Sequence, residues 1–177
     1  MKKKASRFFR AFLAVLLAFT CIPSGSLAVS VKAADTPVNM NLALNKTVTA
    51  SAECGSMPAS KLTDDDKESR WSTEADATQW AYVDLGDSYE MNYFSIIWES
   101  DSVYGGDYNI YVSDSADDWG KPVVSREGNT TAVSEETLAE AVSGRYVKLE
   151  VTDVVGYPSV SARDFTIMLK DDSQPTP

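Results

Sequence analysis

The chain has 177 residues, with 16 Lys and Arg against 26 Asp and Glu, and a formal net charge of −10 at pH 7. It contains no histidine, which excludes Ser-His-Asp and Cys-His catalysis and a zinc site with histidine ligands. So acidic a composition also argues against binding nucleic acid through a basic patch.

Residues 1–33 have the pattern of a secretory signal peptide. A basic start precedes an apolar run of 12 residues, Ala11 to Ile22, and small residues end at Val31-Lys32-Ala33. The run is short of the roughly 20 residues that span a bilayer. We therefore expect cleavage after Ala33, a secreted or cell-surface location, and no membrane insertion of the product. Two alternatives stay open, namely retention of the segment as an anchor and lipidation of Cys21.

Cleavage would leave ten Lys and Arg against 26 Asp and Glu, a formal charge of −16 that suits cations and uncharged ligands. The roughly 144 remaining residues are enough for one domain with its own core. Cys54 would have no partner, so no disulfide framework is expected. We read residues 34–40 as a lead-in, 41–170 as the domain, and 171–177 as a linker or tail.

Apolar residues from position 41 onward recur mostly with a period of two. The alternating runs are QWAYVDLG (79–86), MNYFSIIWES (91–100), YNIYVS (108–113), RYVKLEV (145–151) and FTIML (165–169). Short alternating runs separated by Gly, Asp, Ser and Asn predict an all-β antiparallel sandwich or barrel. One segment differs: SEETLAEAVSG has Ser134 as a possible N-cap and stops at Gly144, which predicts one or two helical turns.

The acidic stretch TDDDKESRW (63–71) is a candidate cation site. In a turning loop, Asp64 and Asp66 can point the same way while Asp65 points outward. Calcium takes six to eight oxygen ligands, of which such a loop supplies part. The alternative is a solvated acidic turn, and a DxD spacing without a complete EF-hand loop does not decide between the two.

No motif for an enzymatic reaction is present. Glu53 and Glu99 could in principle pair as glycosidase carboxylates, but their spacing does not indicate it. Cys54 has no histidine to activate it and is expected to be a packing residue. We therefore expect no catalytic residues and a protein that is not an enzyme.

Six stretches in order resemble the discoidin, or coagulation factor 5/8 type C, domain, and in particular the bacterial carbohydrate-binding modules of family 32. They are NLALNKTVTASAE (41–53), ASKLTDDDKESRWST (59–73), QWAYVDLGDSYEM (79–91), FSIIWE (94–99), YNIYVSDSADDW (108–119) and RYVKLEV (145–151). The resemblance implies an eight-stranded antiparallel jelly-roll β-sandwich of the galactose-binding-domain-like type, with its termini close together.

The resemblance also implies a structural calcium ion in the acidic loop. Carried over by position, its ligands would be Lys61, Asp64, Asp66, Ser69 and Asp164. Asp164 stands where the family usually has Glu, and Asp65 where it usually has a Gly that permits positive φ. Trp71 is expected to pack beneath the loop while Arg70 offsets nearby acids, and Trp80, Trp98 and Trp119 fall at positions that are mostly core.

Family members bind ligands through loops at one end of the sandwich, which correspond here to residues 53–58, 72–78, 99–107 and 156–161. The side chains selected from these loops and just behind them are Glu53, Glu99, Asp101, Tyr104, Tyr157 and Arg163. Aromatic and planar polar groups are what a sugar needs. Without histidine a galactose preference does not transfer, and a neutral sugar is favoured over an acidic one.

The expected function is that of a monomeric, secreted, non-catalytic carbohydrate-binding module. Three alternatives stay open. An adhesion or protein-binding discoidin domain would use exposed apolar loop tips such as Met57 and Val103. The chain could also be a targeting module detached from a glycoside hydrolase, or a small hydrolase.

Overall fold

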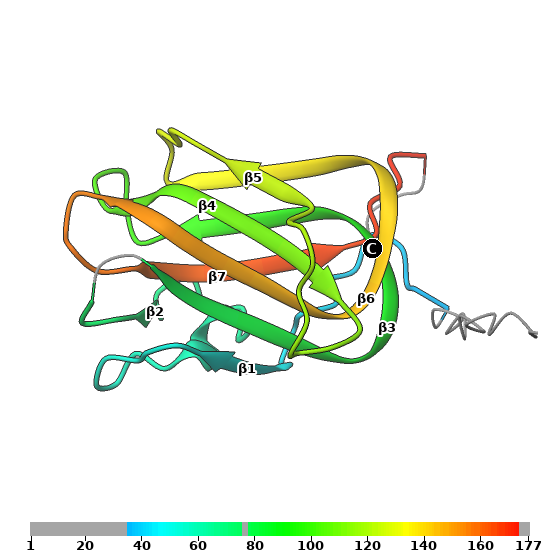
Figure 1. The fold of residues 1–177 in the computed structure, drawn as a ribbon, viewed down its shortest axis with the longest axis horizontal. Coiled ribbons are helices and arrows are strands. Elements are labelled where there is room, and N and C mark those ends of the chain that lie inside the picture. Colours follow the sequence, from blue (N-terminus) through cyan, green and yellow to red (C-terminus); the bar gives the residue numbers. More distant parts are fainter. Residues whose placement is uncertain (1–34, 76–77, 174–177) are drawn as a thin grey trace, which may run out of the picture. The chain divides into compact units, whose positions relative to one another are not determined.

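The computed structural model in Figure 1 describes residues 35–75 and 78–173. Its elements are β1 (Thr47–Ala50), the 3₁₀-helix η1 (Ala59–Leu62), β2 (Trp71–Ser72), β3 (Gln79–Trp98), β4 (Tyr104–Ser113), β5 (Val124–Arg126), β6 (Val133–Val155) and β7 (Ser161–Met168). Strand dominates, which confirms the all-β class. The predicted signal peptide lies outside the described residues.

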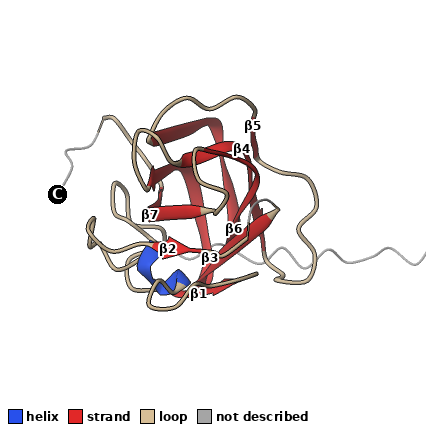
Figure 2. Ribbon diagram, turned by 90° about the vertical axis from the view of Figure 1, so that its left-hand side faces the viewer, coloured by secondary structure: helices blue, strands red, loops and turns tan. Residues whose placement is uncertain are grey.

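Two long strands, β3 and β6, organise the sandwich because each runs through both of its layers (Figures 1 and 2). Residues 79–84 of β3 pair with 146–151 of β6, and after a register shift residues 89–97 pair with 133–144. The first pairing lies in one layer with β1, β4 and β5, and the second lies in the other layer with β2 and β7.

All pairings between these strands are antiparallel, and the jelly-roll sandwich is confirmed. Seven strands are present in the described residues where eight were expected. β3 and β6 each continue from one layer into the other, so each of these long strands takes part in both layers.

The core lies between the layers and follows the predicted alternation. On β3, Ala81, Val83 and Leu85 are at most 1% exposed, while the intervening side chains face outward. Trp71 and Trp98 are buried as expected, and the Trp71 indole donates to the Ala52 carbonyl at 3.0 Å.

Two other tryptophans do not belong to the core. The expectation that Trp80 and Trp119 are core residues is not met, because both are half-buried on the outer side of the first layer. Trp80 directly precedes Ala81, whose side chain is buried in the core. Because successive side chains of a strand point to opposite faces, the Trp80 side chain lies on the outer face.

The predicted helix over residues 134–144 is wrong, because this segment is the first half of β6. Ser134 and Glu136 point inward while Glu135 is exposed, which is a period of two. Backbone pairing with β3, for example Phe94 with Glu136, outweighs the helix propensity of Glu, Ala and Leu. Glu136 is buried in the structure, whereas a glutamate in a sequence is normally expected to face solvent, so the strand pattern was not evident.

The ends of the domain lie together, as the resemblance implies. In the lead-in, Val38 forms a bridge with Leu169, and the Asn39 amide donates to the Leu169 carbonyl at 2.8 Å. The Asn39 side chain also exchanges two hydrogen bonds with the Asp171 backbone, both of 2.9 Å. Within the described residues, no helix is long and apolar enough to cross a membrane.

The ion pair between Asp84 of β3 and Arg145 of β6 predicts a pH-dependent contribution to stability. Hydrogen bonds of 2.7 and 2.8 Å from Arg145 hold the pKa of Asp84 below its usual value, in spite of partial burial. A lowered pKa stabilises the fold above the unfolded value of about 3.9, and this stabilisation is lost as the pH falls through the folded value. Thermal unfolding should find Asp84→Asn less stable than wild type at pH 7.

The difference between Asp84→Asn and wild type should shrink below about pH 4, where Asp84 of the unfolded chain gains its proton, and should vanish once the pH has passed the lower folded pKa. Asp101→Asn, at an exposed turn position, is the matched control and should unfold like wild type at both pH values. A difference for Asp84→Asn that stays constant down to the acid limit would contradict the ion-pair explanation.

Candidate functional site

Two turns at the same end of the sandwich form the walls of the candidate site (left in Figure 1). The turn between β3 and β4 is closed by two hydrogen bonds of 3.2 Å between Ser100 and Val103. The turn between β6 and β7 begins at Gly156, which has φ +89° and lies so close to the Ser102 carbonyl that a Cβ would approach its oxygen to 1.9 Å. The two turns therefore pack backbone against backbone.

A pocket of about 850 Å³ opens beside these turns, and we call it the loop-end pocket. The chemically distinctive side chains that line it are Cys54, Arg70, Glu74, Glu99 and Tyr157. They come from the loop before η1, the segment that carries β2, and the two turns. The pocket thus draws together four parts of the chain that the long strands bring to one end.

Arg70 and the two carboxylates set the electrostatics of the loop-end pocket. Arg70 Nη2 lies 3.6 Å from Glu99 Oε1, which leaves the guanidinium and carboxylate within ion-pair range but beyond hydrogen-bonding distance. Arg70 Nε is buried and has no hydrogen-bond partner among the described residues. With Glu74 also present, two acids face one base, so the lining carries a net negative charge.

Tyr157 supplies the exposed aromatic surface of the loop-end pocket. Its side chain is 67% exposed, whereas most large apolar side chains of the domain are buried. Met57 and Val103, the expected apolar tips of a protein-binding surface, line the same pocket and are only half exposed. The apolar contribution at this end is therefore part of a pocket wall and not a protruding patch.

Cys54 does not have the character of a nucleophile. Its Sγ lies 3.3 Å from Glu74 Oε1 and donates to it. This hydrogen bond raises the pKa of the Cys54 thiol, because ionisation would place two negative charges side by side. The thiol is protonated at neutral pH, whereas a reactive cysteine needs its thiolate.

The structure brings two of the six predicted ligand-binding residues, Glu99 and Tyr157, into the loop-end pocket. Glu53 instead accepts a hydrogen bond of 2.8 Å from the Ala59 amide at the start of η1. Asp101 is exposed on the β3–β4 turn and does not line the pocket. Tyr104 packs half-buried against the core.

Arg163 does not line the loop-end pocket but contacts the turn that carries Glu99. Its Nε donates to the Glu99 carbonyl at 3.0 Å, and its Nη1 donates to the Lys67 carbonyl at 2.8 Å. It therefore ties the acidic loop to the turn that carries Glu99. Sequence reasoning missed Arg70 and Glu74 as site residues. The available signal was their place directly before and shortly after the short buried strand of Trp71 and Ser72.

The acidic loop has the backbone that the family position requires. Asp65 has φ +58°, in the left-handed region where the family usually has glycine. Asp64 accepts hydrogen bonds from Lys61 Nζ at 2.9 Å, the Asp66 amide at 3.1 Å and the Ser69 hydroxyl. Burial alone would raise the pKa of Asp64, but these hydrogen bonds outweigh it and hold the pKa below its usual range.

Asp164, the fifth predicted calcium ligand, forms an ion pair with Lys67. It is 2% exposed, and its Oδ1 lies 2.9 Å from Lys67 Nζ, which also contacts Asp65 at 3.2 Å. The Thr166 hydroxyl donates to the other oxygen at 2.7 Å. The carboxylates of Asp64 and Asp164 are hard oxygen ligands of the kind that calcium prefers. In this structure, however, the Lys61 ammonium group contacts Asp64 and the Lys67 ammonium group contacts Asp164. Between residues 35 and 173, apart from 76–77, no three acidic or cysteine side chains form a ready-made metal cage.

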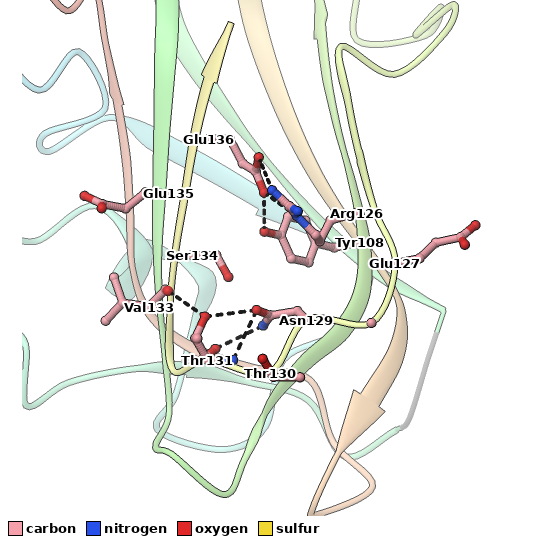
Figure 3. A pocket seen from close by; sticks show the side chains of 11 residues that line it. Tyr108, Arg126, Glu127, Asn129, Thr130, Thr131, Val133, Ser134, Glu135 and Glu136 are labelled. Carbon is pink, nitrogen blue, oxygen red and sulfur yellow. Dashed lines mark hydrogen bonds and ion pairs between the residues drawn. The ribbon is translucent and has the colours of Figure 1, made fainter.

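Figure 3 shows a second pocket, of about 410 Å³, between β4, β5 and the first half of β6. Arg126 makes two hydrogen bonds of 2.9 and 2.8 Å to Glu136, and the Tyr108 hydroxyl donates to the same carboxylate at 2.7 Å. Burial raises the pKa of Tyr108 to about 12, so the phenol keeps its proton at neutral pH. This network satisfies its own charges, whereas the loop-end pocket leaves a buried donor free among the residues described.

Comparisons with known proteins agree with the fold. The family model of the F5/8 type C domain matches residues 47–165. A comparison with curated proteins found no significant match.

Among solved structures, chitosan-binding module 1 of a chitosanase/glucanase from Paenibacillus sp. IK-5 is 32% identical, with a TM-score of 0.65 over 72% of this chain and 98% of that module. Chitosan-binding module 2 of the same enzyme, solved in complex with chitotriose, is 27% identical, with the same TM-score and coverage. A family 32 carbohydrate-binding module of C. perfringens NanJ, in complex with galactose, is 18% identical over 70% of this chain and 93% of that one, with a TM-score of 0.62, and supports the fold. The chain belongs to the F5/8 type C domain family.

Proposed function

We propose that this protein is a non-catalytic carbohydrate-binding module and that its loop-end pocket binds glucosamine oligosaccharides of the chitosan type. Modules that bind chitosan are similar to it at 32% and 27% identity over nearly their whole length. The observation that carries the proposal is the composition of the pocket, which combines the carboxylates of Glu74 and Glu99 with an exposed Tyr157.

Each part of the pocket matches a feature of glucosamine. A protonated amino group can form charge-assisted hydrogen bonds with the carboxylates of Glu74 and Glu99, which are stronger than neutral ones. The Tyr157 ring offers an apolar surface for the CH face of a pyranose. The Arg70 guanidinium, whose Nη2 lies 3.6 Å from Glu99 Oε1, offers N–H donors for a sugar hydroxyl or ring oxygen.

The net charge of the protein favours the same class of ligand. An acidic lining and an acidic domain attract a cationic oligosaccharide and repel a uronic acid polymer. A single pocket of this kind binds weakly, so repeated glucosamine units on a polymer would raise the overall affinity. We further propose that the protein is exported and attaches a cell, or an enzyme linked to the module, to chitosan outside the cell.

The proposed function is tested by calorimetric titration with three oligosaccharides of equal length. Chitotriose should bind saturably, N,N′,N″-triacetylchitotriose should bind at least about tenfold more weakly because it lacks the ammonium groups, and a triuronic acid should not bind. Equal affinity for the amine and its acetylated form would contradict a role for the carboxylates. No binding of any glycan would leave the adhesion alternative.

We also propose that the acidic loop binds calcium as a structural ion, held by Asp64 and neighbouring oxygen donors once the lysine ammonium groups give way. Binding to the folded state would add about 2.7 kcal/mol of stability at a hundredfold excess over Kd. The melting temperature should therefore rise by several degrees in calcium relative to chelator, and Asp64→Ala should abolish that rise.

Lysine variants provide the control for this calcium prediction. Lys67→Met removes an ammonium that competes for Asp164, and it should enlarge the calcium-dependent rise if the metal displaces that group. Identical melting temperatures of the wild type in calcium and in chelator would contradict a calcium site and favour an acidic turn neutralised by Lys61 and Lys67.

A further inference from the structure

The outer face of the first layer carries aromatic and charged side chains in register across β3, β6 and β4. One row across the three strands is Tyr82, Lys148 and Tyr111, and the adjoining rows are Trp80, Glu150 and Asn109, and Asp84, Tyr146 and Ser113. The inner side of the same strands is occupied by core residues such as Val83, Leu149 and Ile110, which are fully buried. These aromatic rings therefore have no place in the core and form a separate surface.

The rings on this face contact one another and leave a hollow. Trp80 and Tyr82 stack with centroids 5.8 Å apart and an interplanar angle of 13°, and Trp119 from the β4–β5 loop lies 5.5 Å from Tyr82. A cavity of about 280 Å³ remains between Trp80, Tyr82, Trp119 and the neighbouring charged residues. Trp80 and Tyr82 are two residues apart on β3, so their side chains leave the same face of the sheet, where Trp119 joins them.

The charges in this cavity are balanced, in contrast to those of the loop-end pocket. Lys148 Nζ lies 4.3 Å from the centroid of the Tyr111 ring, 4.9 Å from that of Trp119, and 3.5 Å from Glu150 Oε1. The Tyr111 hydroxyl donates to the other Glu150 oxygen at 2.9 Å. One ammonium and one carboxylate thus offer a donor and an acceptor with no net charge, which suits hydroxyl groups on an uncharged ligand.

We propose that this outer aromatic face, centred on Trp80, Tyr82 and Trp119, is a second glycan-binding site, and that its ligand is an uncharged oligosaccharide. The aromatic side chains that line the cavity can pack against the apolar face of a pyranose, while Lys148 and Glu150 can exchange hydrogen bonds with pairs of hydroxyls. The balanced charge gives no preference for the cationic sugars proposed at the loop-end pocket. The site stands on its own residues and does not depend on that proposal.

Titration with laminarihexaose and cellohexaose, two uncharged glucose oligosaccharides, tests the outer site. Indole N–H signals in nuclear magnetic resonance spectra are the readout, because Trp80 and Trp119 are half-buried while Trp71 and Trp98 are in the core. Saturable shifts of the first two signals are expected with at least one oligosaccharide. Trp80→Ala should weaken this binding at least tenfold, and Trp80→Tyr should retain most of it.

Two controls separate this site from the loop-end pocket and from a loss of folding. Tyr157→Ala, at the other site, should leave glucose oligosaccharide binding unchanged, and Trp80→Ala should keep a cooperative thermal transition. If Trp80→Ala fails to fold, Glu150→Gln is the second variant and should weaken binding at least threefold. No shift of the Trp80 and Trp119 signals at millimolar oligosaccharide, or binding left unchanged by the Trp80→Ala and Glu150→Gln variants, would each overturn the proposal.

Discussion

Replacing Glu99 by Gln is expected to weaken chitotriose binding about ten- to a hundredfold. A hydrogen bond to a charged group contributes about 1.5–3 kcal/mol, and each 1.4 kcal/mol is a factor of ten in affinity. The amide keeps the size and shape of the carboxylate, so the loss would report the charge. Glu74→Gln should have a similar but smaller effect, because Glu74 is exposed and better solvated. Calorimetric titration measures both.

Asp101→Asn is the matched control for the Glu99 variant. It removes the same charge from the same turn, yet Asp101 does not line the loop-end pocket. Its affinity for chitotriose should remain within a factor of about two of wild type, the effect of a distant charge screened by salt. Equal losses in Glu99→Gln and Asp101→Asn would mean that the overall charge of the protein attracts the ligand, and the pocket would lose its assignment.

Gly156→Ala is expected to damage both the loop-end pocket and the stability of the domain. The added Cβ would meet the Ser102 carbonyl oxygen at 1.9 Å, and a φ of +89° is unfavourable for any residue with a side chain. The β6–β7 turn must move away from the β3–β4 turn, which displaces Tyr157 from Glu99. We expect at least tenfold weaker chitotriose binding and a melting temperature lower by about 5–10 °C.

Gly128→Ala is the control that separates backbone strain from the clash between the two turns. Gly128 also has a positive φ, +65°, but an added Cβ would meet no atom within 4 Å beyond its chain neighbours, and Gly128 does not line the loop-end pocket. It should lose some stability and keep its affinity for chitotriose. If Gly156→Ala binds like wild type, the contact between the turns does not position the pocket.

The fold could be predicted from the sequence because its signals are local and repeated. Ala81, Val83 and Leu85 alternate with polar or aromatic neighbours, and that period of two survives in the buried positions of β3. The left-handed conformation at Asp65 was also predictable, since it follows from the family position and from the tolerance of Asp for that region.

The remaining features depend on contacts between distant segments. Residues 134–144 are predicted as helical from Ser134 as an N-cap and the stop at Gly144. That Glu136 instead points inward follows only from its distant partners Arg126 and Tyr108. Arg70 reads as a partner of the neighbouring aspartates until the fold places it beside Glu99.

The outer aromatic face could not be predicted from the sequence, because it depends on how three separate strands are aligned with one another. Lys148 lies between Tyr82 and Tyr111 only because β3, β6 and β4 pair as they do. In the sequence, these three residues belong to separate alternating runs, and each is equally consistent with an ordinary solvent-facing position.

A titration of the protein with chitotriose, followed through its backbone amide signals by nuclear magnetic resonance, tests the central claim most directly. The account predicts saturable shifts that cluster at residues 54–57, 70–74, 99–103 and 157–159, which surround the loop-end pocket. Shifts that cluster on another surface, or no shifts up to millimolar chitotriose, would contradict the assignment of this pocket as the chitosan site.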